Sequence, residues 1–142
     1  ETLRDRVCAV SNKTHYNEMN VLSMHALIGA YQPQGYEWVD ELNQVLAGNI
    51  EYFCDYVDKH FEGVSYSRPQ GTYMVFLDCT EWCREHGRDI QWLLDEGARV
   101  GVGYQDGRPF HGPCHIRVNL ALPLSRVREA CDRLDRYVFN AQ

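Results

Sequence analysis

The apolar residues of this chain change their spacing at Gly63, and that change limits the possible folds more than any other feature. Before Gly63, apolar residues recur at three-to-four spacing or its multiples, with acidic residues between them: Val39, Leu42, Leu46, Phe53, Val57 and Phe61. This is the pattern of one long amphipathic helix, eased at Gly48 and ending at Gly63. After Gly63 the spacing moves toward alternation, which predicts a sheet.

A shorter helix is predicted upstream of the long one. Apolar residues at helical spacing over residues 20–31 favour a helix there, and residues 32–35 (Gln-Pro-Gln-Gly) are expected to end it in a tight connection. No internal repeat or low-complexity tract interrupts the chain, so one ordinary core is expected.

The sheet is predicted from four β-rich segments. Residues 64–67 and 72–77 flank a turn at 68–71 and give a hairpin-like signal, and residues 100–102 predict a third strand. In residues 116–122, Ile116, Val118, Leu120 and Leu122 alternate with Arg117, Asn119 and Ala121. Successive side chains of a strand point to opposite faces, so Arg117 and Asn119 are expected on the face opposite the apolar stripe.

Further helices are predicted between and after these strands. Residues 80–86 and 89–96 read as short helices, the second broken by Gly97, and residues 105–113 as an irregular loop. A last helix is expected with Ser125 as its N-cap and a buried stripe of Val127, Cys131, Leu134 and Val138. The order predicts an α+β fold in which helices pack on one face of a small, mostly antiparallel sheet.

Composition narrows the classes of protein. The formal charge is −6, with 14 basic residues scattered among 20 acidic ones, so a nucleic-acid binder is not expected. No apolar run approaches the roughly 20 residues of a membrane span, and the first residues do not resemble a signal peptide. Six cysteines spread through apolar segments favour reduced, buried thiols in the cytoplasm over a disulfide framework. Because the chain does not begin with Met, we expect it to be a piece of a longer protein.

Arg117 is the residue whose position most favours a function. A mid-strand guanidinium opposite the apolar stripe suits a bidentate grip on a carboxylate, with Asn119 as a neighbouring hydrogen-bonding group. The alternative is a solvent-facing arginine paired with an Asp or Glu of the same protein.

Four segments, in order along nearly the whole chain, carry a resemblance to a known superfamily. Residues 69–78 resemble the Pro-x-Gly-small-aromatic strand of fold-type I aminotransferases, and residues 116–123 resemble their Arg-x-Asn-x-Ala-x-Pro strand. Residues 17–21 and 36–50 are similar to the cystathionine β-lyase-like branch of carbon-sulfur lyases within that superfamily. The resemblance implies the C-terminal small domain (aminotransferase class I/II) over residues 36–142. Residues 1–35 would then hold the end of the large domain and the interdomain connection.

The resemblance also implies roles for individual residues. Arg117 matches the family arginine that holds the substrate α-carboxylate, while Gly71 and Tyr73 match the supporting hairpin, Gly71 for its backbone conformation and Tyr73 for packing. Asn20 and its neighbours match a segment near the dimer interface of a homodimer. The loop at 104–113 departs from the family in length and residues, which leaves the substrate open.

The family uses pyridoxal 5'-phosphate (PLP) on a Schiff-base lysine, with an Asp at the pyridine nitrogen and a phosphate cup. This chain has only Lys13, in a superficially Ser-x-x-Lys-like segment, and Lys59, and neither lies where the family lysine does. The resemblance therefore implies that PLP is bound mainly by a missing N-terminal part, with no catalytic or cofactor-binding residue here and no activity of the fragment alone.

The implied function of the full-length protein is that of a PLP-dependent enzyme acting on amino acids, in first place a carbon-sulfur β-lyase. An aminotransferase is the alternative, and a noncatalytic interaction or regulatory module is the alternative of another class. No metal site is expected, because the spacing in residues 111–115 (His-Gly-Pro-Cys-His) matches no common zinc pattern. Cys79 and Cys83, four residues apart, are expected to be packing residues.

Overall fold

A computed structural model of the chain describes residues 2–15 and 18–140. It divides into two compact units, Glu1–Glu41 and Leu42–Gln142, and the boundary falls inside helix α3, Pro33–His60. The assignment of residues 1–35 to a larger domain stays a prediction. In the described ranges, no helix has an apolar stretch long enough to cross a membrane.

The first unit contains two helices that begin with side-chain caps. Helix α1, Leu3–Thr14, starts with a capping box between Thr2 and Asp5. Helix α2, Val21–Ala30, confirms the predicted helix, and the Asn20 side chain caps it by accepting the backbone N–H of Ser23 at 2.9 Å. Asn20 therefore has a structural role, whereas Asn17 of the same motif lies outside the described residues.

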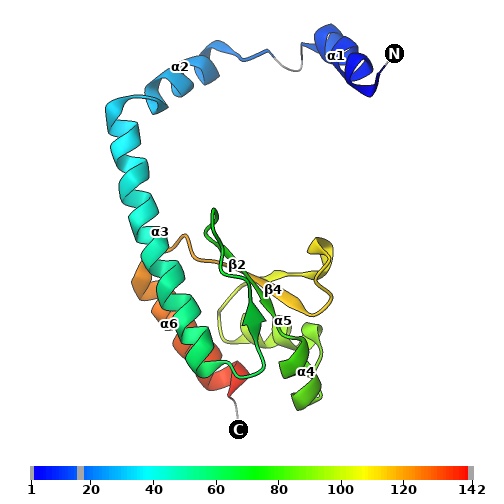
Figure 1. Ribbon diagram of the computed structural model, residues 1–142, viewed down its shortest axis with the longest axis vertical. Coiled ribbons are helices and arrows are strands. Elements are labelled where there is room, and N and C mark those ends of the chain that lie inside the picture. Colours follow the sequence, from blue (N-terminus) through cyan, green and yellow to red (C-terminus); the bar gives the residue numbers. More distant parts are fainter. Residues whose placement is uncertain (1, 16–17, 141–142) are drawn as a thin grey trace. The chain divides into compact units, whose positions relative to one another are not determined.

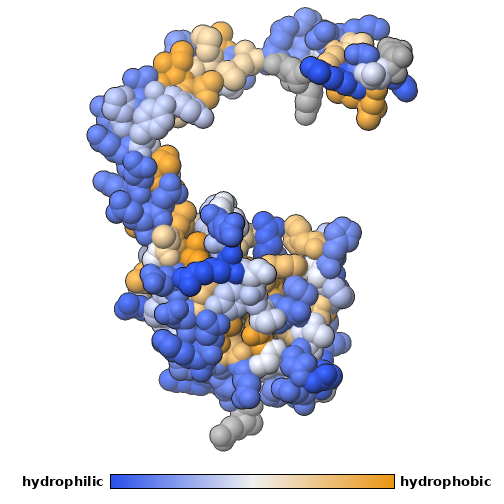
Figure 2. Space-filling view, in the orientation of Figure 1, coloured by the Kyte–Doolittle hydropathy of each residue, from blue (hydrophilic) through white to orange (hydrophobic). Residues whose placement is uncertain are grey.

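Helix α2 is apolar but has no buried residue. Its large side chains are 43–82% exposed, and Figure 2 shows apolar surface over this helix. A ten-residue helix is only marginally stable without tertiary packing. Since α2 buries no side chain inside its own unit, that unit contributes little to the stability of the helix.

Helix α3 begins earlier than predicted. Pro33 is its first residue, a position for which the fixed φ of proline is already suited, so residues 32–35 do not form a separate connection. A Cβ at Gly35 would lie 2.0 Å from the Ala30 carbonyl oxygen, which explains glycine at this tight junction. The helix continues through Gly48 and ends at His60; Gly63 follows with a φ of +77°.

The second unit contains a four-stranded antiparallel sheet in the order β1-β2-β4-β3 (Figure 1). The strands are β1, Ser65–Tyr66; β2, Met74–Asp78; β3, Gln105–Asp106; and β4, His115–Asn119. The pairing of β1 with β2 confirms the predicted hairpin. The prediction of a strand at residues 100–102 was wrong. The Val102 N–H donates to the Gly97 carbonyl at 2.8 Å, which keeps this segment against the preceding helix.

Within its described residues, the second unit also contains helices α4, Thr80–His86; α5, Ile90–Arg99; and α6, Leu124–Leu134. Helix α4 confirms its prediction. Gly97 does not break α5, which continues to Arg99; Gly97 is a buried residue of this helix and packs against the Tyr104 ring, which lies after the helix. Ser125 is not the cap of α6, because the helix already begins at Leu124 and has no side-chain cap bond.

The core lies on one face of the sheet, as predicted. It joins strand residues such as Val75, Leu77 and Ile116 to the helices. The predicted last-helix stripe is buried as well, through α6 and into the π-helical turn Asp135–Phe139, which contains Val138. Leu122 departs from the prediction and is 47% exposed, because β4 ends at Asn119 and the strand alternation no longer applies to it.

Candidate functional site

Arg117 lies in the middle of β4, on the face opposite the core. Its partners in register are Phe76 of β2 and Gln105 of β3. Its neighbours in β4, Ile116 and Val118, are buried, whereas Arg117 is half-buried. The predicted alternation is confirmed here: the core fixes the strand, and the strand holds Arg117 outward.

The guanidinium of Arg117 contacts an aromatic ring and no carboxylate. Its Cζ lies 4.6 Å from the centroid of the Phe110 ring. Within residues 2–15 and 18–140, no acidic group lies within 4.0 Å of it. In the described structure, Arg117 is therefore not paired with an Asp or Glu of the same chain. Its positive charge remains available to an anion.

Asn119 is exposed at the end of β4, opposite Met74. Its Oδ1 accepts the backbone N–H of Ala121 at 2.8 Å, which shapes the turn after the strand. The carboxamide NH₂ is the group that Asn119 can still offer to a ligand.

His115 shares the outer face of the sheet with Arg117. Its ring is tilted against Phe76 at 4.6 Å between centroids, and its Nε2 lies 3.8 Å from Oδ2 of Asp78. Burial raises the pKa of the Asp78 carboxyl, but hydrogen bonds from the Thr80 hydroxyl and backbone N–H outweigh it, so the pKa lies below its usual value. In the described parts of the chain, no group of three or more His, Cys, Asp or Glu is arranged to hold a metal ion.

A buried amide supports the strand that carries Arg117. Asn49 of α3 is 1% exposed, and its Nδ2 donates to the carbonyls of Leu120 at 2.9 Å and Leu122 at 2.7 Å. The Leu120 N–H donates in turn to the Tyr73 carbonyl at 2.9 Å. These bonds satisfy the backbone where β4 ends and fix it against α3 and β2.

Two residues of the family-like hairpin do not have the roles predicted for them. Gly71 has no positive φ and nothing near its would-be Cβ, so its backbone does not require glycine. The Tyr73 side chain is 43% exposed, so this residue supports the site through its carbonyl rather than through packing. Tyr73 also lines an open groove of about 640 Å³ between α3 and residues 68–73, which does not include Arg117.

In the part of the chain that the structure describes, Cys79, Cys83 and the two lysines show no sign of a second site. Burial raises the pKa of the Cys83 thiol to about 12 and also raises that of Cys79, so both stay protonated at neutral pH, which fits packing residues. Lys13 and Lys59 are exposed at the ends of α1 and α3.

One contact of the site was not predicted from the sequence. Phe110 lies in the segment predicted to be an irregular loop, yet it belongs to a short 3₁₀ turn, Arg108–Phe110, that brings its ring over Arg117. The only sequence signal for it is an aromatic residue inside a Gly- and Pro-rich segment.

No protein-family model matches the chain, but individual proteins do. A Mycobacterium leprae protein named "Putative cystathionine beta-lyase" is 36% identical and covers 75% of this chain. A PLP-bound C-S lyase from Staphylococcus hominis has a TM-score of 0.76 at 23% identity, covering 89% of this chain and 33% of the lyase. An aspartate aminotransferase variant from Thermus thermophilus has a TM-score of 0.76 at 18% identity, covering 92% of this chain and 34% of the aminotransferase.

These matches concern one part of longer proteins. The chain spans about 29% of the length of the curated relatives that it matches. The structural likeness shows the fold, which lyases and aminotransferases share.

Proposed function

The chain belongs to the fold-type I aminotransferase superfamily, in which it is similar to the cystathionine β-lyase-like branch, and on this premise we propose a function. We propose that the chain is the small-domain part of a PLP-dependent enzyme acting on amino acids. The reaction proposed first is carbon-sulfur β-elimination. Support for it comes from the sequence relatives, each of which is named "Putative cystathionine beta-lyase".

The observation that carries the proposal is the unpaired guanidinium of Arg117 on the outer face of β4. A planar fork of N–H donors matches the two oxygens of an α-carboxylate, and a strand anchored through the core holds it in a fixed place. In the proposed role, Arg117 binds and orients the substrate carboxylate, with the Asn119 amide as a neighbouring donor. A substrate held at one end presents its reacting bond in one orientation, which is a large part of catalysis in such enzymes.

The residues of this chain do not fit PLP by themselves. The cofactor requires a lysine placed in a site, and Lys13 and Lys59 are exposed residues at the ends of α1 and α3. We therefore propose that PLP is bound by a part of the protein outside this chain and that the chain alone is inactive. A homodimer in the cytoplasm is proposed for the whole protein.

An aminotransferase is the second candidate, because an aspartate aminotransferase matches the fold with the same TM-score as the S. hominis lyase. The two candidates differ in product. A β-lyase releases pyruvate from L-cystathionine or L-cysteine, whereas an aminotransferase exchanges the amino group and releases none.

The test is an absorbance spectrum of the complete protein with PLP, before and after L-cystathionine or L-cysteine, together with a pyruvate assay. The β-lyase predicts a visible cofactor band that shifts with substrate and yields pyruvate. A shift without pyruvate would move the assignment to transamination, and a complete protein with no such band would contradict the proposal. The 142-residue chain, treated in the same way, is the control and should show no cofactor band.

A further inference from the structure

Phe110 lies over Arg117 although the core does not require it there. The Phe110 side chain is 46% exposed, and its ring centroid lies 4.6 Å from the Cζ of Arg117. Phe110 belongs neither to the buried core nor to the partly buried residues that pack against it. The Arg117 cation beneath the ring is a favourable partner that does not depend on the core.

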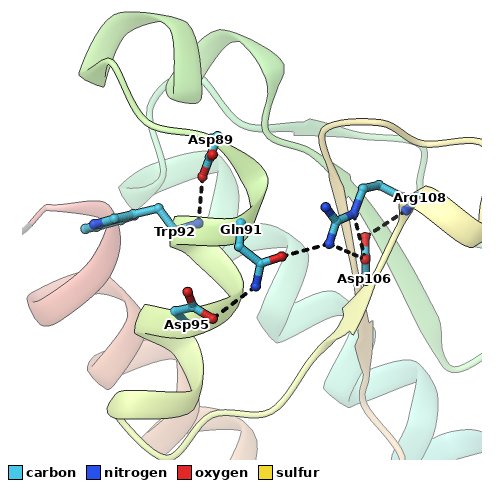
Figure 3. Close-up of polar contacts among 6 residues, drawn as sticks. All are labelled: Asp89, Gln91, Trp92, Asp95, Asp106 and Arg108. Atoms are coloured by element: carbon cyan, nitrogen blue, oxygen red, sulfur yellow. Dashed lines mark hydrogen bonds and ion pairs between the residues drawn. The ribbon is translucent and has the colours of Figure 1, made fainter.

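The turn that carries Phe110 is held to α5 by a polar network (Figure 3). The Arg108 guanidinium donates to Oδ2 of Asp106 at 2.7 Å and to Oε1 of Gln91 in α5 at 2.9 Å. The Arg108 backbone N–H donates to Oδ1 of Asp106 at 2.9 Å, and Gln91 is bonded in turn to Asp95. The polar side chains of this network thus fix the start of the turn.

Both ends of the turn also pack directly on the strands around Arg117. A Cβ at Gly107 would lie 2.4 Å from the His115 carbonyl oxygen, and one at Gly112 would lie 2.5 Å from Cζ of Phe76. The Gly112 N–H donates to the Gly107 carbonyl at 3.0 Å and closes the turn. Glycine at both positions lets the turn approach the sheet, which places Phe110 over the guanidinium.

We infer that Phe110 is a positioning residue that holds the Arg117 guanidinium oriented for a substrate carboxylate. An aromatic ring contacts a cation without neutralising it, whereas a carboxylate in the same place would occupy its donors. Holding a long, flexible side chain in place before binding reduces the entropy that binding must otherwise cost. The inference rests on the proposed role of Arg117.

The experiment compares Phe110→Leu with Phe110→Tyr in the complete, PLP-loaded protein. The Leu variant keeps an apolar side chain but loses the aromatic face, and the Tyr variant keeps that face. We measure kcat and KM for L-cystathionine, and the Kd for propionate, a carboxylate without an amino group, by a ligand-observed NMR titration. The Leu variant should raise KM and the propionate Kd about three- to fivefold at an unchanged kcat, whereas the Tyr variant should match the wild type.

Tyr137→Leu is the matched control. Tyr137 is 47% exposed and lies under Arg136 at 5.8 Å, so this variant removes an equally exposed ring from another arginine and should leave both constants unchanged. Arg117→Ala separates the two proposals. If Arg117→Ala leaves the propionate Kd unchanged, the proposed role of Arg117 fails and that of Phe110 fails with it, whereas the cofactor band and the pyruvate assay still decide the proposed reaction. If Arg117→Ala weakens propionate but Phe110→Leu does not, or if Phe110→Leu lowers kcat at an unchanged KM, the role of Phe110 is overturned and that of Arg117 stands.

Discussion

Arg117 is a cation with an aromatic neighbour and, among residues 2–15 and 18–140, no acidic partner, so its removal should affect ligand binding far more than folding. In the complete enzyme, Arg117→Ala should lower kcat/KM for amino-acid substrates. The corresponding loss of transition-state stabilisation is about 2 to 4 kcal/mol, the value of two lost charge-assisted hydrogen bonds to the carboxylate. Arg117→Lys should recover part of this loss, because it restores the charge but not the planar fork.

The control for Arg117 is Arg128→Ala. Arg128 of α6 is exposed and lies over a different ring, that of Tyr52 at 5.2 Å. Its kinetics should equal those of the wild type, while PLP absorbance stays unchanged in both variants. Wild-type kcat/KM in Arg117→Ala would remove this residue from the site.

Asn49 is the buried residue whose polar group matters most to the end of β4. Asn49→Ala leaves the Leu120 and Leu122 carbonyls without their donor, which should lower the free energy of unfolding by about 1 to 3 kcal/mol. Urea unfolding of the chain, followed by the fluorescence of buried Trp82, measures this loss. Asn43→Ala, an exposed asparagine of the same helix, should lose nothing; equal losses in the two variants would show that the bonds of Asn49 contribute no stability.

At the scale of elements, replacing glycine with alanine should change the free energy of unfolding in opposite directions at two helical positions. Gly48 of α3 has nothing within 4 Å of its would-be Cβ, so Gly48→Ala should stabilise by about 0.5 to 1 kcal/mol through helix propensity. At Gly97 of α5 a Cβ would meet the Tyr104 ring at 2.5 Å, and overpacking should outweigh propensity for a net loss of about 1 to 2 kcal/mol. Urea unfolding of both variants measures the difference, and a stabilised Gly97→Ala would show that Tyr104 can move aside without cost.

Elements with a clear period could be predicted from sequence, and those set by single contacts could not. The helical stripe of α3 and the alternation of Ile116 to Val118 gave the right element and the right face for Arg117. The sequence wrongly predicts a helix end at Gly97, because only the position of Tyr104 shows why a glycine stands inside α5. Strand β3 has two residues and therefore no period, and Phe110 reaches Arg117 through a turn whose closure depends on tertiary contacts.

At the scale of the whole chain, the two units differ in what stabilises them. The second unit has a core that joins helices to the sheet, whereas α2 in the first unit has no buried residue. Backbone amides exchange at rates set by the opening of their own structural unit, so helices without buried contacts exchange first. Amide hydrogen exchange of the 142-residue chain, read by mass spectrometry, should therefore be fast over residues 21–30 and slow over β2 and β4.

The same measurement on the complete protein tests whether this chain is one part of a larger fold. If the proposed remainder of the enzyme covers the apolar side chains of α2, exchange over residues 21–30 should slow there by a large factor, while β2 and β4 change little. Slow exchange of α2 already in the 142-residue chain would mean that this helix finds its partners within the chain. Fast exchange of α2 in both proteins would mean that its apolar surface stays open to water in the assembled enzyme, against the expectation that such a surface is covered.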